Sequence, residues 1–240
     1  MNKEYFLRGN LVQSVRAPVV GNLLYDELGK LVLRKLNERF KGVPCIEFTQ
    51  KFRSNKPITH SNVLRVLAID QILREEGLDI HVLSLEEVVR YQNAIPERTS
   101  TYSDTNSVVI YPKEGSNKEI RQKALQLVGK SFTEVPLVVS GLGVERADNN
   151  LGFTFTQTDH VLVREAPYLT EDGYVIYDPV KECLVKSDQG ISVWVPRNLR
   201  DQSGLRGLYR NSSDVLVYND DELLYSSNID RVQLFSSLDI

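Results

Sequence analysis

The chain has 240 residues, of which 41% are hydrophobic and 25% are charged, and its formal net charge at pH 7 is −3. This length allows one large domain or two small ones with an ample apolar core. A disulfide-stapled scaffold is excluded because the two cysteines, Cys45 and Cys183, lie far apart, and no run approaches the roughly 18 apolar residues of a membrane span. Residues 1–18 lack the features of a signal peptide, so we expect a cytoplasmic protein.

Charge is distributed unevenly along the chain. Residues 1–57 carry eleven Lys and Arg against five Asp and Glu, a net charge of +6, whereas residues 201–240 carry three against seven, a net charge of −4. A basic N-terminal quarter is compatible with a phosphate or nucleic-acid partner. Its cations alternate with acidic residues on an expected helix face, so we interpret most of them as solvated surface and do not expect nucleic-acid binding.

Two amphipathic helices are expected in the first third of the chain. Apolar residues recur at three- and four-residue spacing from Leu24 to Phe40, and Gly42 supplies a stop signal. An expected strand at residues 44–50 and a basic loop follow. Residues 61–77 then form a second helix, whose apolar positions cover much of its circumference. This second helix is therefore expected to be largely buried.

Strand and helix patterns continue to alternate up to about residue 140. Further strands are expected at residues 79–83, 107–111 and 135–140. The helices between them begin at the capping-box patterns Ser84–Glu87 and Ser116–Glu119. Residues 93–106 are too polar, and too rich in Pro, Ser and Thr, for regular structure. The alternation predicts an α/β N-terminal half, residues 1–147, with a mainly parallel sheet and covering helices.

From about residue 151 the pattern changes to short alternating or β-branched runs separated by turn-forming residues. We interpret residues 151–240 as a β-rich antiparallel region, either a second domain or an extension packed on the first. Residues 214–235 resemble a three-stranded meander. Helices longer than two turns are not expected in this region, and Trp194 should be buried with most of the alternate aromatic residues.

A basic loop between the expected strand at 44–50 and the helix at 61–77 is the first candidate ligand site. In parallel sheets, ligands bind where strands end and the following helices begin, because free helix amides and the helix dipole favour anions. The loop offers cationic and hydrogen-bonding side chains for a phosphate or carboxylate: Lys51, Arg53, Ser54, Asn55, Lys56, Thr59, His60 and Ser61. It contains no glycine and is not a Walker loop.

A second candidate loop follows the apolar strand at 135–140. Ser140 supplies a hydroxyl, and Gly141 and Gly143 would let a ligand approach the backbone closely. A tight turn would need the same residues. If the strands are parallel, this loop and the basic loop lie at one edge of the sheet, and Arg53 and Lys56 face a concavity shared with the glycines.

The three histidines, His60, His81 and His160, show no metal-ligand spacing, and no nucleophile or cofactor can be named. The leading hypothesis is a cytoplasmic protein that binds a small phosphorylated or carboxylated ligand, a nucleotide or a metabolite, at the two loops. Whether it is an enzyme stays open, with His60 as the candidate acid or base. The alternative is a noncatalytic protein–protein interaction module that uses the acidic C-terminal meander.

Overall fold

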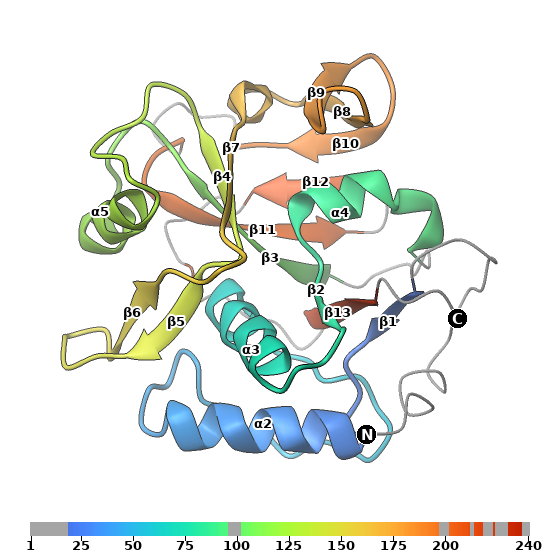
Figure 1. Ribbon diagram of the computed structural model, residues 1–240, viewed down its shortest axis with the longest axis vertical. Helices are drawn as coiled ribbons and strands as arrows, with labels where there is room; N and C mark the ends of the chain where they lie inside the picture. The colour runs from blue at the N-terminus through green and yellow to red at the C-terminus, as the bar shows by residue number, and fades with distance from the viewer. Residues whose placement is uncertain are drawn as a thin grey trace.

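An eleven-stranded mixed sheet forms the centre of the computed structural model, which describes residues 19–95, 102–196, 202–211, 214–217, 223 and 230–236 (Figure 1). The main path of the sheet runs, in spatial order, through β1 (Val19–Asn22), β13 (Arg231–Ser236), β3 (Tyr102–Ile110), β11 (Leu205–Asn211), β12 (Asp214–Val217), β10 (Ile191–Trp194), β8 (Gly173–Asp178) and β9 (Cys183–Ser187). Off this path, β2 (His81–Val82) pairs with β13, and β4 (Leu137–Ser140) pairs with β3 and β7 (Leu162–Glu165). A separate hairpin consists of β5 (Gly143–Arg146) and β6 (Phe153–Thr156).

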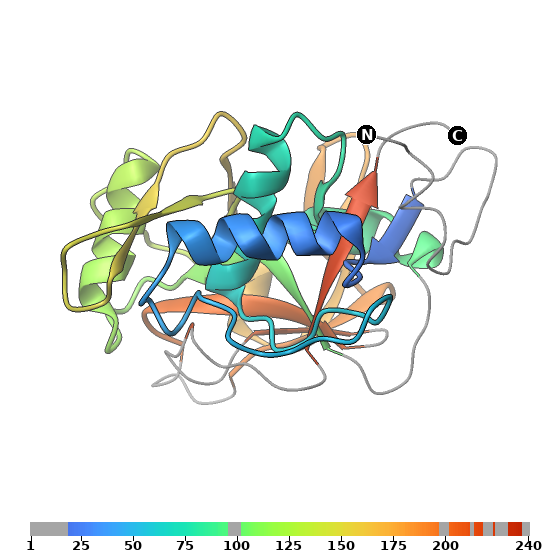
Figure 2. The same ribbon diagram turned by 90° about the horizontal axis from the view of Figure 1, so that it is seen from below.

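Helices cover both sides of this sheet. They are α2 (Glu27–Arg39), α3 (Val63–Glu75), α4 (Leu85–Arg90) and α5 (Lys118–Leu127), with 3-10 turns η1 (Gln92–Ala94) and η2 (Pro167–Thr170). The two long amphipathic helices expected from the sequence are confirmed as α2 and α3. Viewed from below, α2 crosses in front of α3 and the sheet (Figure 2). None of the described helices has the length and apolar composition needed to span a bilayer.

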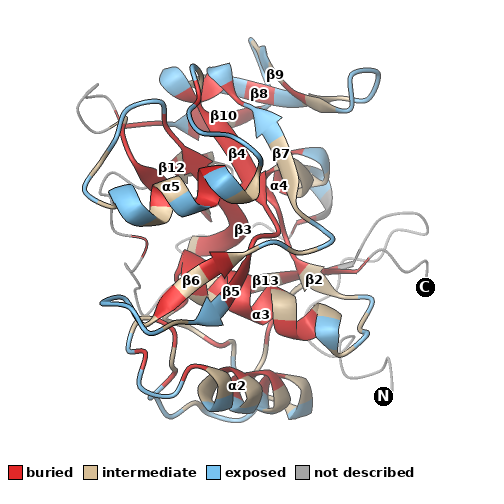
Figure 3. Cartoon of the chain, turned by 60° about the vertical axis from the view of Figure 1, so that its left-hand side comes forward, coloured by how far each residue is buried: buried red, intermediate tan, exposed pale blue. Residues whose placement is uncertain are grey.

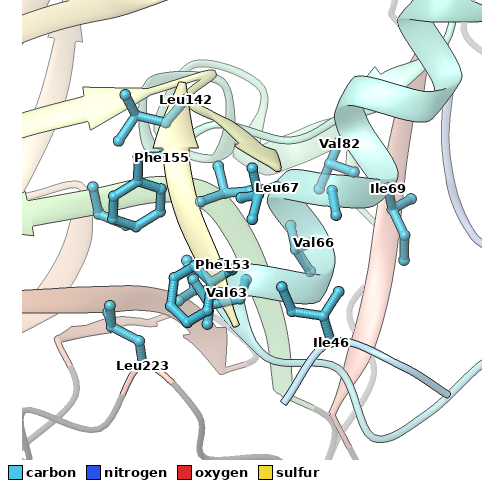
Figure 4. Packing of buried hydrophobic residues seen from close by; sticks show 14 of the residues in the cluster. Ile46, Val63, Val66, Leu67, Ile69, Val82, Leu142, Phe153, Phe155 and Leu223 are labelled. Atoms are coloured by element: carbon cyan, nitrogen blue, oxygen red, sulfur yellow. The ribbon is translucent and has the colours of Figure 1, made fainter. Parts of the chain in front are cut away.

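The larger apolar core forms around α3, most of whose side chains are fully buried. Val63, Val66 and Leu67 pack toward Phe153 and Phe155 of the β5–β6 hairpin (Figure 4). Helix α2 shields the same core and keeps an exposed outer face, in accordance with its amphipathic pattern (Figure 3). Burial of α3 on nearly all sides is what its apolar circumference predicted.

The expected parallel α/β half is wrong, since the structure is mostly β-sheet and its N-terminal strands pair antiparallel. β3 and β4 are antiparallel, and β2 is antiparallel to β13. Residues 44–50 form turns and irregular chain instead of a strand, although Ile46 and Phe48 are buried. Among the described strand pairs, only β3–β13 and β10–β12 are parallel.

Burial on both faces explains this error. In β3, Val108 and Ile110 join the core around α3, whereas Val109 and Tyr111, just beyond its end, join a second core beneath α4 and β8. A strand buried on both sides has a continuous apolar sequence whatever its direction, so the pattern reports burial rather than parallel pairing. The relative direction of two strands follows from how the chain connects and pairs them, which the local pattern does not encode.

Two local expectations in the same region also need correction. The polar residues up to Asn106 were expected to be irregular, yet β3 begins at Tyr102, and Ser103 to Ser107 are all buried in it. The capping box of α4, Ser84–Glu87, is confirmed. At α5 the N-cap is Asn117 without a side-chain cap, because the Asn117 amide exchanges two hydrogen bonds with the backbone of Leu205.

The strands β6 to β10 and β13 occur largely where the sequence predicts them. The described part of residues 151–240 contains no helix longer than η2. The three-stranded meander predicted at residues 214–235 is not formed, since β3 and β11 separate β12 from β13 in the sheet. Most of its predicted middle strand lies outside the described residues. Trp194 is 42% exposed and Tyr174 is 47% exposed, contrary to expectation, whereas Phe153 and Phe155 are buried.

Candidate functional site

A pocket with a volume of about 390 Å³ opens at the C-terminal end of α3. Its wall combines side chains from α3, β2, α4, β3, the end of β4, the segment before β7, and β13. The lining residues are Arg74, His81, Ser84, Glu86, Glu87, Arg90, Tyr91, Asn106, Ser140, Gly141, His160, Leu162 and Phe235. Segments that are far apart in the sequence therefore meet here, and most of them contribute a polar group.

His81 and Glu87 form a hydrogen-bonded pair on one wall of the pocket. The distance from His81 Nε2 to Glu87 Oε1 is 2.6 Å. Glu87 Oε2 accepts hydrogen bonds from the Ser84 amide at 2.8 Å and from the Ser84 hydroxyl at 2.9 Å. Burial alone would raise the pKa of Glu87, but His81 and Ser84 outweigh it and hold that pKa below its usual value. The capping box thus fixes a carboxylate that orients His81.

Asp70 holds two further pocket residues in place. Its carboxylate is almost completely buried and accepts from the Val82 amide at 2.6 Å through Oδ1. Its Oδ2 atom accepts from Arg74 Nε at 3.0 Å and from Asn106 Nδ2 at 3.3 Å. Both donors to Oδ2 belong to side chains that line the pocket. A buried carboxylate that accepts several hydrogen bonds holds its donors in place.

Glu86 and Arg90, both on α4, complete the rim. Burial raises the pKa of Glu86, and Arg164 at 3.8 Å opposes this shift. The Arg90 guanidinium lies over the ring of Tyr177, 4.8 Å from its centroid. Within the described part of the chain, neither Arg90 nor His160 forms a salt bridge. These two cationic or ionisable groups are therefore available to a ligand.

The basic loop lies elsewhere. Residues 41–60 run back alongside α2 (Figure 2), and hydrogen bonds to the backbone of Tyr25 fix Asn55 and Lys56 beside the start of that helix. The side chains of Lys51, Arg53, Ser54, Asn55 and Lys56 are exposed, and none of these residues lines the pocket. Phe52 anchors the loop through ring contacts with Tyr25 and Phe48.

The end of this loop closes the N-terminus of α3 to a ligand. Ser61 is fully buried and donates its hydroxyl to Asp104, while Thr59 bonds to the ring of His60. Asn62 caps the helix by accepting from the Arg65 amide at 2.9 Å. Desolvation lowers the pKa of His60, and Arg65 adds to the shift. The amides expected to bind an anion are therefore buried or already capped.

The glycine loop does reach the pocket, through Ser140 and Gly141. Ser140 Oγ lies 2.7 Å from Ser107 Oγ. Gly141 has a φ of +73°, and a Cβ atom there would lie 2.6 Å from the carbonyl oxygen of His160. A Cβ atom on Gly143 would lie 2.4 Å from Thr156 Oγ1. Both glycines thus permit a close approach of the protein's own chain rather than of a ligand.

The two loops predicted to share a concavity lie at opposite ends of α3. The basic loop leads into its first residue, Val63, whereas the turn at residues 141–143 packs beside Gln71, whose side chain accepts from the Val144 amide. Gln71 follows Val63 by eight residues, so at about 1.5 Å per residue the helix separates the loops by roughly 12 Å. Sequence reasoning brought them together only because it assumed parallel strands.

Of the residues that line the pocket, only Ser140 and Gly141 were predicted as site residues. The sequence analysis missed the others: Arg74, His81, Ser84, Glu86, Glu87, Arg90, Tyr91, Asn106, His160, Leu162 and Phe235. Two signals for the site were present in the sequence. The capping box placed Ser84 and Glu87 at one helix start, and Asp70 and Arg74 stand at i and i+4 of a helix, the spacing of an ion pair. No sequence signal indicated Asn106, because it lies in a stretch that resembled a loop.

Comparison of the chain with protein-family models, with curated proteins and with solved structures finds no match. Within the described residues, no group of three His, Cys, Asp or Glu side chains is arranged to hold a metal ion. Half of the acidic segment of the alternative hypothesis, residues 218–222 and 224–229, lies outside the described residues. The site therefore has to be interpreted from its own chemistry.

Proposed function

We propose that the protein binds a small ligand with a carboxylate or phosphate group in the pocket at the C-terminal end of α3. The observation that carries this proposal is the convergence of Arg74, Arg90, His81 and His160, from four separate segments, on one pocket. Guanidinium and imidazole groups are the usual donors to such anions. A volume of about 390 Å³ is within the range of small-molecule sites.

The charges of the pocket limit the ligand to a small, partly polar molecule. Asp70, Glu86 and Glu87 formally balance Arg74, Arg90 and Arg164, and the two histidines add positive charge only when they are protonated. Glu87 is already hydrogen-bonded to His81 and Ser84, so it repels an incoming anion less than a free carboxylate would. A monoanionic metabolite suits this balance better than a polyphosphate, whose charge would remain largely uncompensated.

Calorimetric titration with carboxylated and phosphorylated metabolites tests the proposal. We expect Arg90→Gln and His160→Gln each to weaken binding, by about 1.5 to 3 kcal/mol if a charge-assisted hydrogen bond is lost. Both residues are exposed, so folding stability should change by about 1 kcal/mol or less, the larger change being expected for Arg90→Gln, which loses its contact with the Tyr177 ring. Thermal unfolding of each variant checks that expectation.

Arg53→Ala and Lys56→Ala are the matched controls, because they remove exposed cations from the basic loop at the other end of α3. Unchanged affinity in these two variants, with weakened binding in the pocket variants, supports the pocket. Weaker binding in Arg53→Ala alone would place the ligand at the basic loop. Failure of every anionic probe to bind would contradict the proposed function as a whole.

A further inference from the structure

The side chain of Asn106 is the most informative polar group in the pocket. Asn106 is only 2% exposed, and its main chain is fixed by hydrogen bonds from its amide to the Leu83 carbonyl and from the Gly141 amide to its own carbonyl. Its side-chain oxygen, Oδ1, is buried and has no hydrogen-bond partner among the described residues. A buried acceptor without a partner costs about 1–3 kcal/mol, so such an atom calls for a partner that the protein does not supply.

The orientation of this amide follows from its neighbour. The atom of Asn106 that lies 3.3 Å from Asp70 Oδ2 has to be the amide nitrogen, because an ionised carboxylate only accepts hydrogen bonds. The reverse orientation would put two acceptor oxygens in contact. Asn106 therefore presents an acceptor, not a donor, to whatever occupies the space beside it.

Arg74 shares the same anchor. Its Nε donates to Asp70 Oδ2 at 3.0 Å, so Arg74 and Asn106 both use one oxygen atom and must lie side by side. The two terminal nitrogens of Arg74 have no hydrogen-bond partner among the described residues. One carboxylate oxygen thus holds the guanidinium of Arg74 and the side-chain amide of Asn106 side by side, and both residues line the pocket.

We propose that the ligand carries a hydroxyl or amino donor close to its anionic group, as a 2-hydroxy or 2-amino carboxylate does, or a phosphate monoester with a hydroxyl on the carbon beside the ester carbon. The anionic group accepts from the terminal nitrogens of Arg74, and the neighbouring donor pairs with Asn106 Oδ1. This inference rests on the proposed function and specifies its ligand class. A site with a buried acceptor discriminates strongly against an analogue without the donor, because that analogue leaves the acceptor unpaired.

Matched pairs of probes test the inference by ligand-observed NMR titration of the wild-type chain. The pairs are lactate against propionate, alanine against propionate, and glycerol 3-phosphate against propyl phosphate. We expect the donor-bearing member of at least one pair to bind about tenfold or more tightly than its partner, the effect of one hydrogen bond to a buried group. The pair that shows the difference identifies the anion and the donor.

Asn106→Leu should abolish that preference, since it removes the acceptor and keeps the branched shape of the side chain. Thr105→Val is the matched control, because Thr105 is also buried in β3 and donates to the Leu208 carbonyl instead of lining the pocket. If both members of every pair bind equally to the wild type, the inference is overturned while the proposed function stands. If no probe binds, the proposed function itself fails. The comparison of probes on the wild-type chain remains decisive should Asn106→Leu fail to fold.

Discussion

At the scale of single residues, two hydrogen-bonded carboxylates, one buried (Asp70) and one partly buried (Glu87), set the geometry of the pocket. Asp70 ties α3 to β2 and β3, and Glu87 ties β2 to the start of α4. Each accepts hydrogen bonds from at least two other residues, so its charge is compensated where it stands. The polar side chains of the pocket are therefore held in place before any ligand arrives, which lowers the entropy lost on binding.

Glu87 should make folding stability depend on pH. Because its pKa in the folded state is lowered from 4.5, its contribution is fully present above that pH and is lost as the pH falls through the folded-state pKa. Urea unfolding across the acidic range should therefore show a fall in the free energy of unfolding that is smaller in Glu87→Gln. Glu38→Gln, which removes an exposed carboxylate on α2, is the control. An identical fall in wild type and Glu87→Gln would contradict the assignment.

At the scale of elements, the turn between β4 and β5 brings the segment before β7 against the pocket. Gly141 makes this contact possible, because its positive φ and missing side chain admit the His160 carbonyl. The Thr158 hydroxyl reinforces the contact by donating to the Gly141 carbonyl at 2.7 Å. The close approach of the backbones at Gly141 and His160 thus positions His160. The turn therefore shapes the pocket by holding the segment that carries this residue.

Replacing Gly141 with alanine should lower the free energy of unfolding by about 2 kcal/mol or more, because the alanine would have a strained positive φ and its Cβ atom would clash with a backbone carbonyl. Gly173→Ala is a matched control, because the nearest atom to its added Cβ would be Lys186 Cε at an ordinary 3.6 Å. We expect Gly173→Ala to change stability by about 0.5 kcal/mol or less. Chemical denaturation measures both variants, and equal stability of the two would show that the turn relaxes easily.

At the scale of the whole molecule, strands from the N-terminal half of the chain pair with strands from the C-terminal half. β3 pairs with β11 and β13, and β4 pairs with β7, so strands before residue 147 find partners after residue 151. Both cores also combine residues from the two halves of the chain. The β-rich C-terminal part therefore completes the sheet begun by the N-terminal part.

A fragment of residues 1–147 should not fold cooperatively by itself. It would leave β3 without its partners β11 and β13, and would expose apolar residues that β6, β8 and β10 cover in the full chain. Circular dichroism during urea titration should show no sigmoidal transition for the fragment and a clear one for the full chain. A cooperative transition in the fragment would establish residues 1–147 as an independent domain.

Local patterns in the sequence determined the helices and most C-terminal strands. The spacing from Leu24 to Phe40 specified an amphipathic helix, and Ser84 with Glu87 specified where α4 begins. These features depend on neighbours a few residues away, so the sequence alone contains them. The same spacing places Asp70 beside Arg74, which is one part of the pocket.

Only the tertiary structure decided strand direction, the burial of the polar run in β3, and the place where a ligand could bind. Asn106 looks like a loop residue in the sequence, and it becomes buried because Asp70, Leu83 and Gly141 supply its hydrogen bonds from distant segments. The pairing of β3 with β4 likewise depends on contacts across about thirty residues, which no local pattern encodes. The pocket and the basic loop lie at opposite ends of α3, and periodicity does not distinguish parallel from antiparallel pairing.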